Sequence, residues 1–448
     1  MLSLEKINEY VSLVCSQVRW KKAHNRIKEE MKNHIIDQRD AYAAQGLDED
    51  TATERAITET GDAALLGSQL DRTHRPKPQW GLLAATGALL LLGILIRVFI
   101  FREEDYYGYL YIRLAASAVG IAVMLAAYFS DFSILGKYPK AAFGIVVALS
   151  GAGLFLSSTV NGSRYFMQFA VQYAILLFPL AFSAMIFAMR NKGYRGLILC
   201  ELAFALPALI AVFVPSITGF LLFTASGIAL LCIAACKQWF GVKKTHGFLT
   251  MLVPAAFLAA LFFMNMNSFG WERAAVAANP SLDPTGAGYI GVMTRELLSG
   301  AKLIGRGIIP EEYNVLFTES AIFQTDLLLT RLIAGLGWIS FIIIMGILLF
   351  VIIKGFILCL KQKSTLGLFI SLAVMMTFTF QVVSYVIFNL GFQFLAPMSL
   401  PLLSHGGTAT IINMGLIGFM LSVFRTGNIA QDNQMIPKKE GEAYVADN

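Results

Sequence analysis

Charged residues are scarce in this chain: Asp, Glu, Lys and Arg make up 14% of its 448 residues, whereas 56% are hydrophobic. In soluble globular proteins roughly a quarter of the residues are charged. The mean hydropathy is correspondingly high, at +0.64. This composition excludes a soluble globular protein and predicts an integral membrane protein.

The chain also lacks the short motifs of metal, nucleotide and haem sites. Its five cysteines form no C-x-x-C pair, so we expect neither a disulfide framework nor a zinc site. No Gly-rich phosphate loop, G-x-G-x-x-G or H-E-x-x-H pattern is present. The net charge of +6 does not indicate nucleic acid as a partner, because the basic residues lie between apolar segments, as membrane topology requires.

From Trp80 onward the sequence contains ten apolar segments, each near the ~20 residues that a helix needs to cross a bilayer. They cover roughly residues 81–101, 108–128, 141–159, 168–188, 195–214, 216–236, 247–266, 326–354, 367–390 and 407–424. We therefore predict an all-α, polytopic membrane protein with ten transmembrane helices in residues 79–425. Because the first segment begins so late, we expect no cleavable signal peptide.

Basic connections between these segments all fall on one side of the predicted membrane. They contain Lys137/Lys140, Arg190/Lys192/Arg195, Lys237/Lys243/Lys244 and Lys354/Lys361/Lys363. The positive-inside rule makes this side cytoplasmic, and it places both termini there as well.

Two parts of the chain are expected outside the membrane, on the cytoplasmic side. Residues 1–78 are dense in charges of both signs, with apolar residues at helical spacing, and Gly46 and Asp48 suit the end of one helix and the start of the next. We interpret them as a small helical domain with a proline-containing linker, rather than a charged unfolded leader. Residues 426–448 are expected to form a disordered tail.

One predicted external connection is much longer than the others. Residues 267–325 join the seventh and eighth segments, and loops of this length are uncommon unless they are functional or disordered. The stretch NPSLDPTGAGYIGV is rich in turn formers, and VMTRELLSGAKLIGRG is compatible with an amphipathic helix at the membrane interface. We expect the functional site here.

Asp326 stands where this connection enters the eighth segment, in the stretch FQTDLLLTRL. A carboxylate at a helix start accepts backbone N–H bonds and favours the helix dipole, so local sequence favours an N-cap. An ion pair with Arg331 is unfavourable, because five positions separate the two side chains by about 140° around a helix. A catalytic role for Asp326 stays open.

Three arginines lie within apolar segments, where ionisable groups are candidates for function. Arg97 is near the end of the first segment, and its long side chain is expected to reach the membrane surface. For Arg113 and Arg331 the sequence is equally compatible with reaching the surface and with pairing or lining a polar cavity.

The stretch PMSLPLLSHGGTAT breaks the backbone just before the tenth segment. The N–H groups of Gly406 and Gly407, near a helix N-terminus, are suited to receive an anionic group. A plain re-entrant turn is an alternative interpretation. His405 beside Ser404 does not make a catalytic triad, because the sequence identifies no third group.

Taken in order, these motifs resemble the SEDS family (shape, elongation, division and sporulation), the group of FtsW, RodA and SpoVE. The similar stretches are NPSLDPTGAGY, SGAKLIGRG, Thr325–Asp326 and NLGFQFLAPMSLPLLSHGGT, and the resemblance covers residues 80–425 with the same ten-span topology. Members of this family are peptidoglycan glycosyltransferases that polymerise lipid II, usually with a class B penicillin-binding protein.

The resemblance implies that Asp326 is the catalytic residue, which activates the acceptor sugar hydroxyl or helps to bind a divalent cation. It implies lipid II as the substrate, in a bacterial cytoplasmic membrane whose lipids surround the protein. Lys302 and Arg306 become candidates for contact with pyrophosphate, which favours cationic partners. The other candidates for substrate binding are Thr325, Ser404, Gly406, Gly407 and Arg113.

The sequence also departs from the family pattern. Gln324 replaces a His, Ala334–Gly335 an acidic pair, Tyr165 a Trp and His405 a Tyr, and only Gln172 is left of a QPSE-like segment. A non-catalytic scaffold for a penicillin-binding protein and a lipid-linked precursor flippase therefore stay open as alternatives. The N-terminal region resembles permease-prefix domains of Gram-positive bacteria, which suggests a regulatory or docking module.

Overall fold

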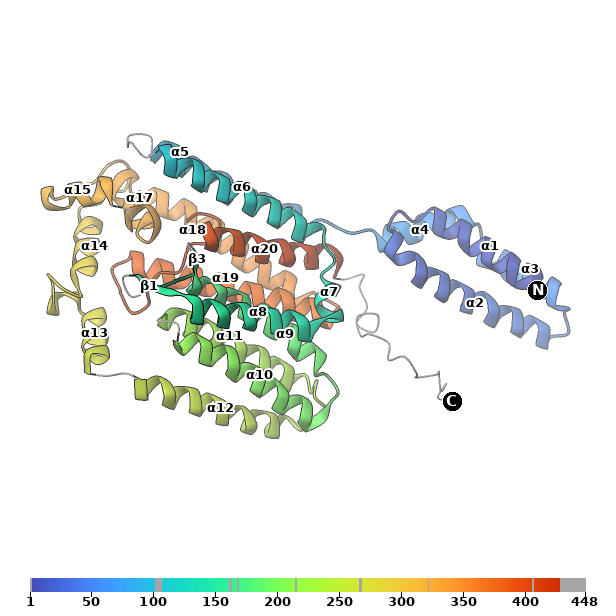
Figure 1. Ribbon diagram of the computed structural model, residues 1–448. Helices are drawn as coiled ribbons and strands as arrows, with labels where there is room; N and C mark the ends of the chain where they lie inside the picture. The colour runs from blue at the N-terminus through green and yellow to red at the C-terminus, as the bar shows by residue number, and fades with distance from the viewer. Residues whose placement is uncertain are drawn as a thin grey trace. The chain divides into compact units, whose positions relative to one another are not determined.

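The structure is a computed structural model that describes residues 2–100, 107–160, 163–166, 169–213, 216–265, 268–320, 322–404 and 407–427. It is mostly helical (Figure 1), as predicted. Cα packing divides it into two compact units, Met1–Pro78 and Gln79–Asn448.

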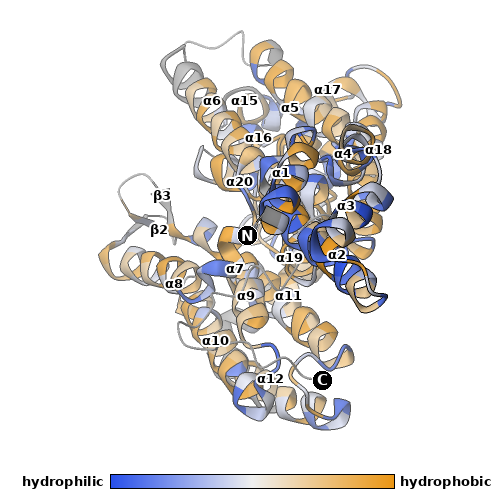
Figure 2. Ribbon diagram, turned by 90° about the vertical axis from the view of Figure 1, so that its right-hand side faces the viewer, coloured by the Kyte–Doolittle hydropathy of each residue, from blue (hydrophilic) through white to orange (hydrophobic). Residues whose placement is uncertain are grey.

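The first unit is a small bundle of short helices. Its elements are α1 (Leu2–Ser16), η1 (Lys21–Ala23), α2 (His24–Ala44), α3 (Glu49–Thr60) and α4 (Ala63–His74). Gly46 adopts a φ of 97° just after α2, and the Asp48 carboxylate caps α3 by accepting a bond from the Thr51 N–H, as the sequence predicts. Hydrophilic residues are frequent on these helices (Figure 2), while Ile7, Val14 and Ile35 are fully buried between them.

The second unit contains the remaining helices, the long apolar ones among them. They are α5 (Trp80–Ile100), α6 (Tyr107–Phe129), α7 (Ser133–Lys137), α8 (Pro139–Leu156), α9 (Phe178–Ala188), α10 (Gly193–Phe213), α11 (Ile217–Cys236), α12 (Lys244–Asn265), α13 (Ser268–Ala278), α14 (Tyr289–Ser299), α15 (Glu311–Glu319), α16 (Ile322–Thr325), α17 (Leu328–Leu336), α18 (Trp338–Leu360), α19 (Thr365–Asn389) and α20 (Gly407–Thr426). Two 3₁₀ helices, η2 (Val171–Leu177) and η3 (Pro280–Leu282), complete the set.

A small antiparallel sheet is the exception to the all-α prediction. Strands β1 (Ser158–Val160), β2 (Ser163–Phe166) and β3 (Phe169–Ala170) lie in the order β1-β2-β3. In this register Tyr165 lies opposite both Ser158 and Ala170. The fourth predicted segment therefore begins as a strand and a 3₁₀ helix, and becomes α-helical only at Phe178.

Eight helices among the described residues are long and apolar enough to cross a membrane. They are Trp80–Val98, Pro139–Leu156, Val171–Ala188, Gly193–Phe213, Ile217–Cys236, Trp338–Leu360, Thr365–Asn389 and Gly407–Thr426. The protein is therefore a multi-pass membrane protein. Two further helices, α6 with 23 residues and α12 with 22, correspond to the remaining predicted segments.

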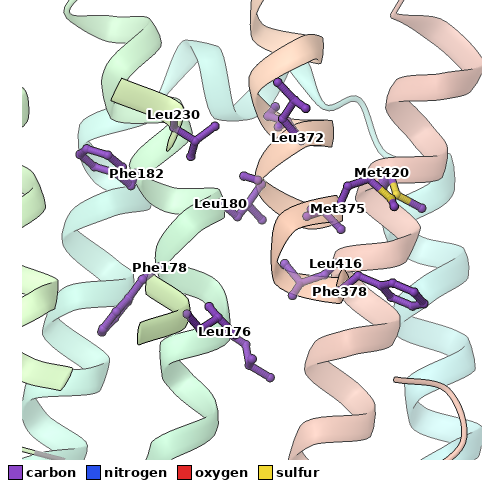
Figure 3. Packing of buried hydrophobic residues seen from close by; sticks show 14 of the residues in the cluster. Leu176, Phe178, Leu180, Phe182, Leu230, Leu372, Met375, Phe378, Leu416 and Met420 are labelled. Atoms are coloured by element: carbon purple, nitrogen blue, oxygen red, sulfur yellow. The ribbon is translucent and has the colours of Figure 1, made fainter. Parts of the chain in front are cut away.

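The core of the second unit lies around α19. Of its most apolar window, 78% is buried inside the protein, compared with 28% for α18, so α19 is central and α18 peripheral. Leu180 of α9, Met375 of α19 and Leu416 of α20 are among the side chains that fill the space between these helices (Figure 3). Such packing holds transmembrane helices together in place of a hydrophobic driving force.

The basic connections gather at one end of the second unit. The Asn191 N–H donates to the Trp239 carbonyl over 2.8 Å, and the Trp239 ring lies 4.2 Å from that of Phe369 near the start of α19. At the same end the Ser422 hydroxyl donates to the Ser130 carbonyl over 2.7 Å. The loops that the sequence assigns to one side of the membrane thus lie together.

The opposite end carries the small sheet and the long connection. Strands β1–β3 and helices α13 to α17 lie there, away from α7 (Figure 1). The Thr218 hydroxyl donates to the Ala396 carbonyl over 2.8 Å, which ties the start of α11 to the segment between α19 and α20. Arg295 of α14 reaches the same segment by donating to the Gly391 carbonyl over 3.1 Å.

The prediction of one continuous helix over 326–354 is wrong. Helix α17 ends at Leu336 and α18 begins at Trp338, because Gly337 between them has a φ of 96°. A Cβ atom at Gly337 would lie 2.6 Å from the Leu303 carbonyl oxygen. The helix is therefore broken at the glycine against which the backbone at Leu303 packs.

Leu303 belongs to the Gly-rich loop, residues 300–308, which was expected to continue an amphipathic helix. The helix is present as α14 but ends at Ser299. The Ile308 N–H donates to the Gly300 carbonyl over 2.9 Å, and a Cβ at Gly307 would lie 2.6 Å from the same oxygen. After Ser299 the chain therefore folds back on itself, with residues 307–308 against Gly300, instead of continuing as a helix.

Arg97 does not reach the membrane surface, contrary to expectation. Its side chain is buried, and its guanidinium donates to the Ser117 hydroxyl of α6 and, over 3.3 Å, to the Ser404 carbonyl. Neighbouring polar groups in the second unit offer these bonds inside the protein, so the side chain has no need to extend to water.

We expect Gly337→Ala to destabilise the protein and Gly335→Ala to leave it nearly unchanged. Alanine at 337 meets both an unfavourable positive φ and the Gly-rich loop, a cost of about 2 kcal/mol or more. A Cβ at Gly335 meets nothing within 4 Å. Thermal unfolding of both variants in detergent tests this, and equal unfolding temperatures would contradict it.

Candidate functional site

Asp326 lies in a tight turn between α16 and α17. Its backbone N–H and that of Leu327 both donate to the Ile322 carbonyl, over 2.9 and 2.8 Å. The Asp326 side chain is half-buried, while Leu327 on its C-terminal side is buried. The turn therefore presents the carboxyl group at the end of the second unit that carries the long connection.

Tyr385 of α19 is hydrogen-bonded to the backbone of this turn. Its hydroxyl donates to the Thr325 carbonyl over 2.5 Å and accepts a bond from the Leu328 N–H over 3.2 Å. These two backbone groups flank the turn, where the helical hydrogen-bond ladder is interrupted. Tyr385 therefore supplies the partners that a continuous helix would have supplied.

Asn389, one helical turn further along α19, completes the arrangement. Its amide nitrogen donates to the Asp326 carbonyl over 2.8 Å, and its amide oxygen accepts from the Thr330 N–H over 3.0 Å. The Thr330 hydroxyl donates back to the Asn389 carbonyl over 3.0 Å. We refer to Tyr385 and Asn389 as the α19 clamp. Together they fix the backbone on both sides of Asp326.

The N-cap interpretation of Asp326 is wrong. The N-cap position of α17 is Leu327, whose own side chain makes no capping bond. The Leu328 and Thr330 N–H groups of the first turn donate to Tyr385 and Asn389 instead. The clamp satisfies the backbone groups of the turn, so the Asp326 carboxylate is not needed for this purpose. Helix capping therefore does not explain why an aspartate stands at position 326.

Burial raises the pKa of Asp326 to about 6, against a smaller opposing effect of a hydrogen bond with the Thr325 side chain. Tyr173 of η2 and Tyr385 both lie within electrostatic range of the carboxyl group. The Arg331 guanidinium lies over the Phe317 ring, 5.8 Å from its centroid. A carboxyl group with a pKa near neutrality is suited to accept and release a proton.

The first part of the long connection docks beside the clamp. The Asp283 carboxylate accepts bonds from the Gly286 and Ala287 N–H groups over 3.1 and 2.7 Å, so the NPSLDPTGAGY stretch is a self-stabilised turn. Next along the chain, the Arg295 guanidinium lies 5.1 Å from the centroid of the Phe392 ring. This contact covers the C-terminal end of α19 near Asn389.

Lys302 and Arg306 are exposed and lie in the Gly-rich loop. The Gly305 N–H donates to the Leu336 carbonyl, and the Trp338 N–H donates to the Lys302 carbonyl, over 2.9 and 3.0 Å. The loop thus runs along the C-terminal end of α17, while Asp326 precedes the N-terminal end. Nine residues of helix separate the two ends by about 13 Å. The fold does not bring these cations next to Asp326.

The other predicted binding residues fall in a third place. Ser404 is buried, and its carbonyl accepts bonds from Arg97 and from the Thr410 hydroxyl, the latter over 3.3 Å. Gly407 is the first residue of α20. Gly406 and the side chain of Arg113 lie outside the described residues. Among the binding candidates that the structure describes, Thr325 is the one directly beside Asp326 in the chain.

The described residues do not offer a cluster of three His, Cys, Asp or Glu side chains for a metal ion. The carbonyls of Thr325 and Asp326 are engaged by the α19 clamp. Mg²⁺ is often held by one or two carboxylates together with substrate phosphates. Asp326 fits such a minimal role, with the remaining ligands supplied by substrate and water.

Tyr173, Tyr385 and Asn389 were not singled out from the sequence. Asn389 belongs to the NLGFQF stretch that carries part of the family resemblance, but no role was assigned to it. Tyr385 and Asn389 are four positions apart in an apolar segment, so they share one helix face. Two polar residues at this spacing in an apolar segment indicate a common hydrogen-bonding site on one face of the helix.

Comparison with known proteins identifies the fold. The family described as cell cycle protein, FtsW/RodA/SpoVE, matches residues 77–428. The chain belongs to this family. The match covers the second unit as far as residue 428, with its ten predicted segments, and helices α1 to α4 lie before it.

Curated relatives in this family are distant. Peptidoglycan glycosyltransferase MrdB of Escherichia coli K12 is 25% identical over 223 residues, which are 49% of this chain and 57% of MrdB. A probable peptidoglycan glycosyltransferase FtsW of Alteromonas naphthalenivorans is 24% identical over 298 residues, 63% of this chain and 55% of that protein. The chain thus spans little more than half the length of these relatives.

Solved structures resemble this chain over a larger share of its length. A chain from a peptidoglycan synthase complex has a TM-score of 0.61 and 20% identity, with coverage of 78% of this chain and 98% of that one. RodA of Thermus thermophilus has a TM-score of 0.52 and 17% identity, with coverage of 78% and 97%. These likenesses establish the fold.

We expect Tyr385→Phe to lower the free energy of unfolding by about 1–3 kcal/mol, because it leaves the Thr325 carbonyl and the Leu328 N–H without their partner in the protein interior. Tyr194→Phe is the matched control. It removes an exposed hydroxyl that bonds to His246 and should have little effect. Thermal unfolding measures both, and a Tyr385→Phe variant as stable as the control would contradict the clamp.

Proposed function

We propose that this protein is a peptidoglycan glycosyltransferase that polymerises lipid II at the outer face of a bacterial cytoplasmic membrane. The observation that carries the proposal is Asp326, a half-buried carboxyl with a raised pKa in a turn that the α19 clamp holds. Membership of the FtsW/RodA/SpoVE family and the names of the curated relatives support it.

The proposed topology has ten transmembrane helices, formed by the eight spans together with α6 and α12. The end with the basic connections faces the cytoplasm by the positive-inside rule. Both termini then lie in the cytoplasm, and the connection from α13 to α17 lies outside. This orientation suits a substrate with a polyprenyl tail in the bilayer and a sugar head at the outer surface.

In the proposed reaction the acceptor sugar hydroxyl attacks the anomeric carbon of the donor. The bond from this carbon to the pyrophosphate oxygen breaks, and the lipid pyrophosphate leaves with the bonding electron pair. The Asp326 carboxylate takes the proton of the attacking hydroxyl. General base catalysis of this kind contributes roughly 10²–10⁴-fold, and a pKa of about 6 leaves the group mostly ionised at neutral pH.

Lys302 and Arg306 remain the proposed contacts for pyrophosphate, although they lie at the other end of α17. A lipid-linked substrate that contacts both groups must extend along this helix, whose two ends are about 13 Å apart. If Asp326 instead helped to bind a divalent cation, that cation would supply charge neutralisation for the leaving group in place of the role of Asp326 as base. The proposed protein partner is a class B penicillin-binding protein, which the similarity to a peptidoglycan synthase complex supports.

Asp326→Ala and Asp326→Asn are expected to lower the rate of lipid II polymerisation at least about 100-fold, because both remove the base. Glu311→Gln, which neutralises an exposed carboxylate of the same connection, should leave the rate unchanged. Purified protein with its penicillin-binding partner and labelled lipid II provides the assay. Robust polymer from the Asp326 variants would remove this residue from the mechanism.

No polymer from the wild type with any cognate partner would favour a non-catalytic scaffold. Movement of labelled lipid II across vesicles without polymer would favour a flippase.

The rate should rise with pH through an acid limb near pH 6, because only the ionised Asp326 acts as base. Stability should change in the opposite direction. Between pH 4 and pH 6, about the ordinary and the folded-state pKa of Asp326, the unfolded chain releases this proton while the folded protein still holds it. The free energy of unfolding therefore falls as pH rises through this range.

Asp326→Asn should therefore raise the unfolding temperature at pH 7.5, and raise it less at pH 5. An equal gain at both pH values would contradict the raised pKa.

A further inference from the structure

Large apolar side chains of the Gly-rich loop are exposed at the surface of the protein. Leu303, Ile304 and Ile308 are 67%, 70% and 73% exposed, although all three belong to a short loop with two exposed cations, Lys302 and Arg306. Clustered apolar side chains at a protein surface usually mark an interaction site. The combination of apolar and basic residues restricts what that site contacts.

Backbone bonds fix the depth of this loop. The Trp338 N–H donates to the Lys302 carbonyl over 3.0 Å, and the Ile339 N–H donates to the Leu303 carbonyl over 3.1 Å. Trp338 is the first residue of the span Trp338–Leu360. Leu303 and Ile304 therefore lie at the level where α18 enters the apolar layer of the membrane.

The surface beside the loop is also apolar and exposed. Only 28% of the apolar window of α18 is buried inside the protein. Leu336 just before α18 and Ile342 and Ile343 within it are more than half exposed. A loop that is bonded to the start of such a helix lies at the protein–lipid boundary.

The residue types match the bilayer interface. Trp at the end of a span and Lys or Arg beside it are enriched at headgroup level, where apolar side chains reach the acyl boundary and cations contact phosphate. Trp338, Lys302 and Arg306 provide these groups around the three exposed aliphatic side chains. A soluble partner domain requires no such depth.

We propose that the Gly-rich loop is a membrane anchor. Leu303, Ile304 and Ile308 insert into the lipid leaflet at the N-terminal end of α18, and Lys302 and Arg306 contact phospholipid phosphates when no substrate pyrophosphate is bound. The long connection is then attached to the bilayer at its middle as well as through its flanking helices. This attachment sets the height of α17, and so of Asp326, relative to the membrane surface.

The test is a nitroxide label at Ile304→Cys in the full-length protein, in a background with Cys232→Ser and Cys236→Ser. The protein is placed in nanodiscs of phosphatidylethanolamine and phosphatidylglycerol, without lipid II or a partner protein. Paramagnetic resonance then compares accessibility to oxygen, which concentrates in lipid, with that to a water-soluble nickel chelate.

Two labelled controls define the scale. Leu65→Cys, in α4 of the first unit, is exposed and lies in none of the eight spans, whereas Ile353→Cys lies on the exposed face of α18. We expect the label at 304 to favour oxygen several-fold more than the label at 65, and less than the label at 353. Accessibility to nickel equal to that at 65 would overturn the anchor, and would indicate a surface left for a protein partner.

The phosphate contacts are tested by Lys302→Gln with Arg306→Gln in the labelled protein. We expect the label at 304 to become more accessible to nickel, since the loop loses its attraction to the headgroups. An unchanged depth would overturn this part of the proposal. Neither measurement depends on polymerisation, so failure of the anchor and failure of the proposed activity are distinguishable.

Discussion

An interrupted helix leaves backbone N–H and C=O groups that must find partners, because each buried group left unsatisfied costs about 1–3 kcal/mol. The turn at Asp326 meets this requirement through the α19 clamp. The Tyr385 hydroxyl and the Asn389 amide replace the helical bonds on both sides of the turn. Because α19 is the most buried of the eight spans, the turn is attached to the centre of the helix packing.

Helix α17 has a different attachment at each end. The clamp holds its N-terminal end, and the Gly-rich loop bonds to the backbone at its C-terminal end, around Gly337. A short helix held at both ends acts as a rigid spacer. It separates the carboxyl group of Asp326 from the cations of the loop, so in the proposed function the two groups contact different parts of one long substrate.

Predictions from the sequence were confirmed where the structure depends on neighbouring residues alone. The apolar segments, the Asp48 cap and the gathering of basic connections follow from hydropathy, capping and charge, which are properties of nearby residues. They failed at Asp326, Arg97 and Gly337. At each of these, groups far away in the chain supply the partner that decides the conformation: α19 for Asp326, Ser117 and Ser404 for Arg97, and Leu303 for Gly337.

The sequence by itself determined that this is a multi-pass helical membrane protein of the FtsW/RodA/SpoVE type, with Asp326 as its leading functional candidate. Hydrophobic segment length and ordered motifs carry that information locally. Only the tertiary structure decided that Asp326 is not a helix cap and that Lys302 and Arg306 lie at the far end of α17. Those facts depend on hydrogen bonds such as Gly305–Leu336, Trp338–Lys302 and Asn389–Asp326, which join residues 31, 36 and 63 positions apart and which no local pattern encodes.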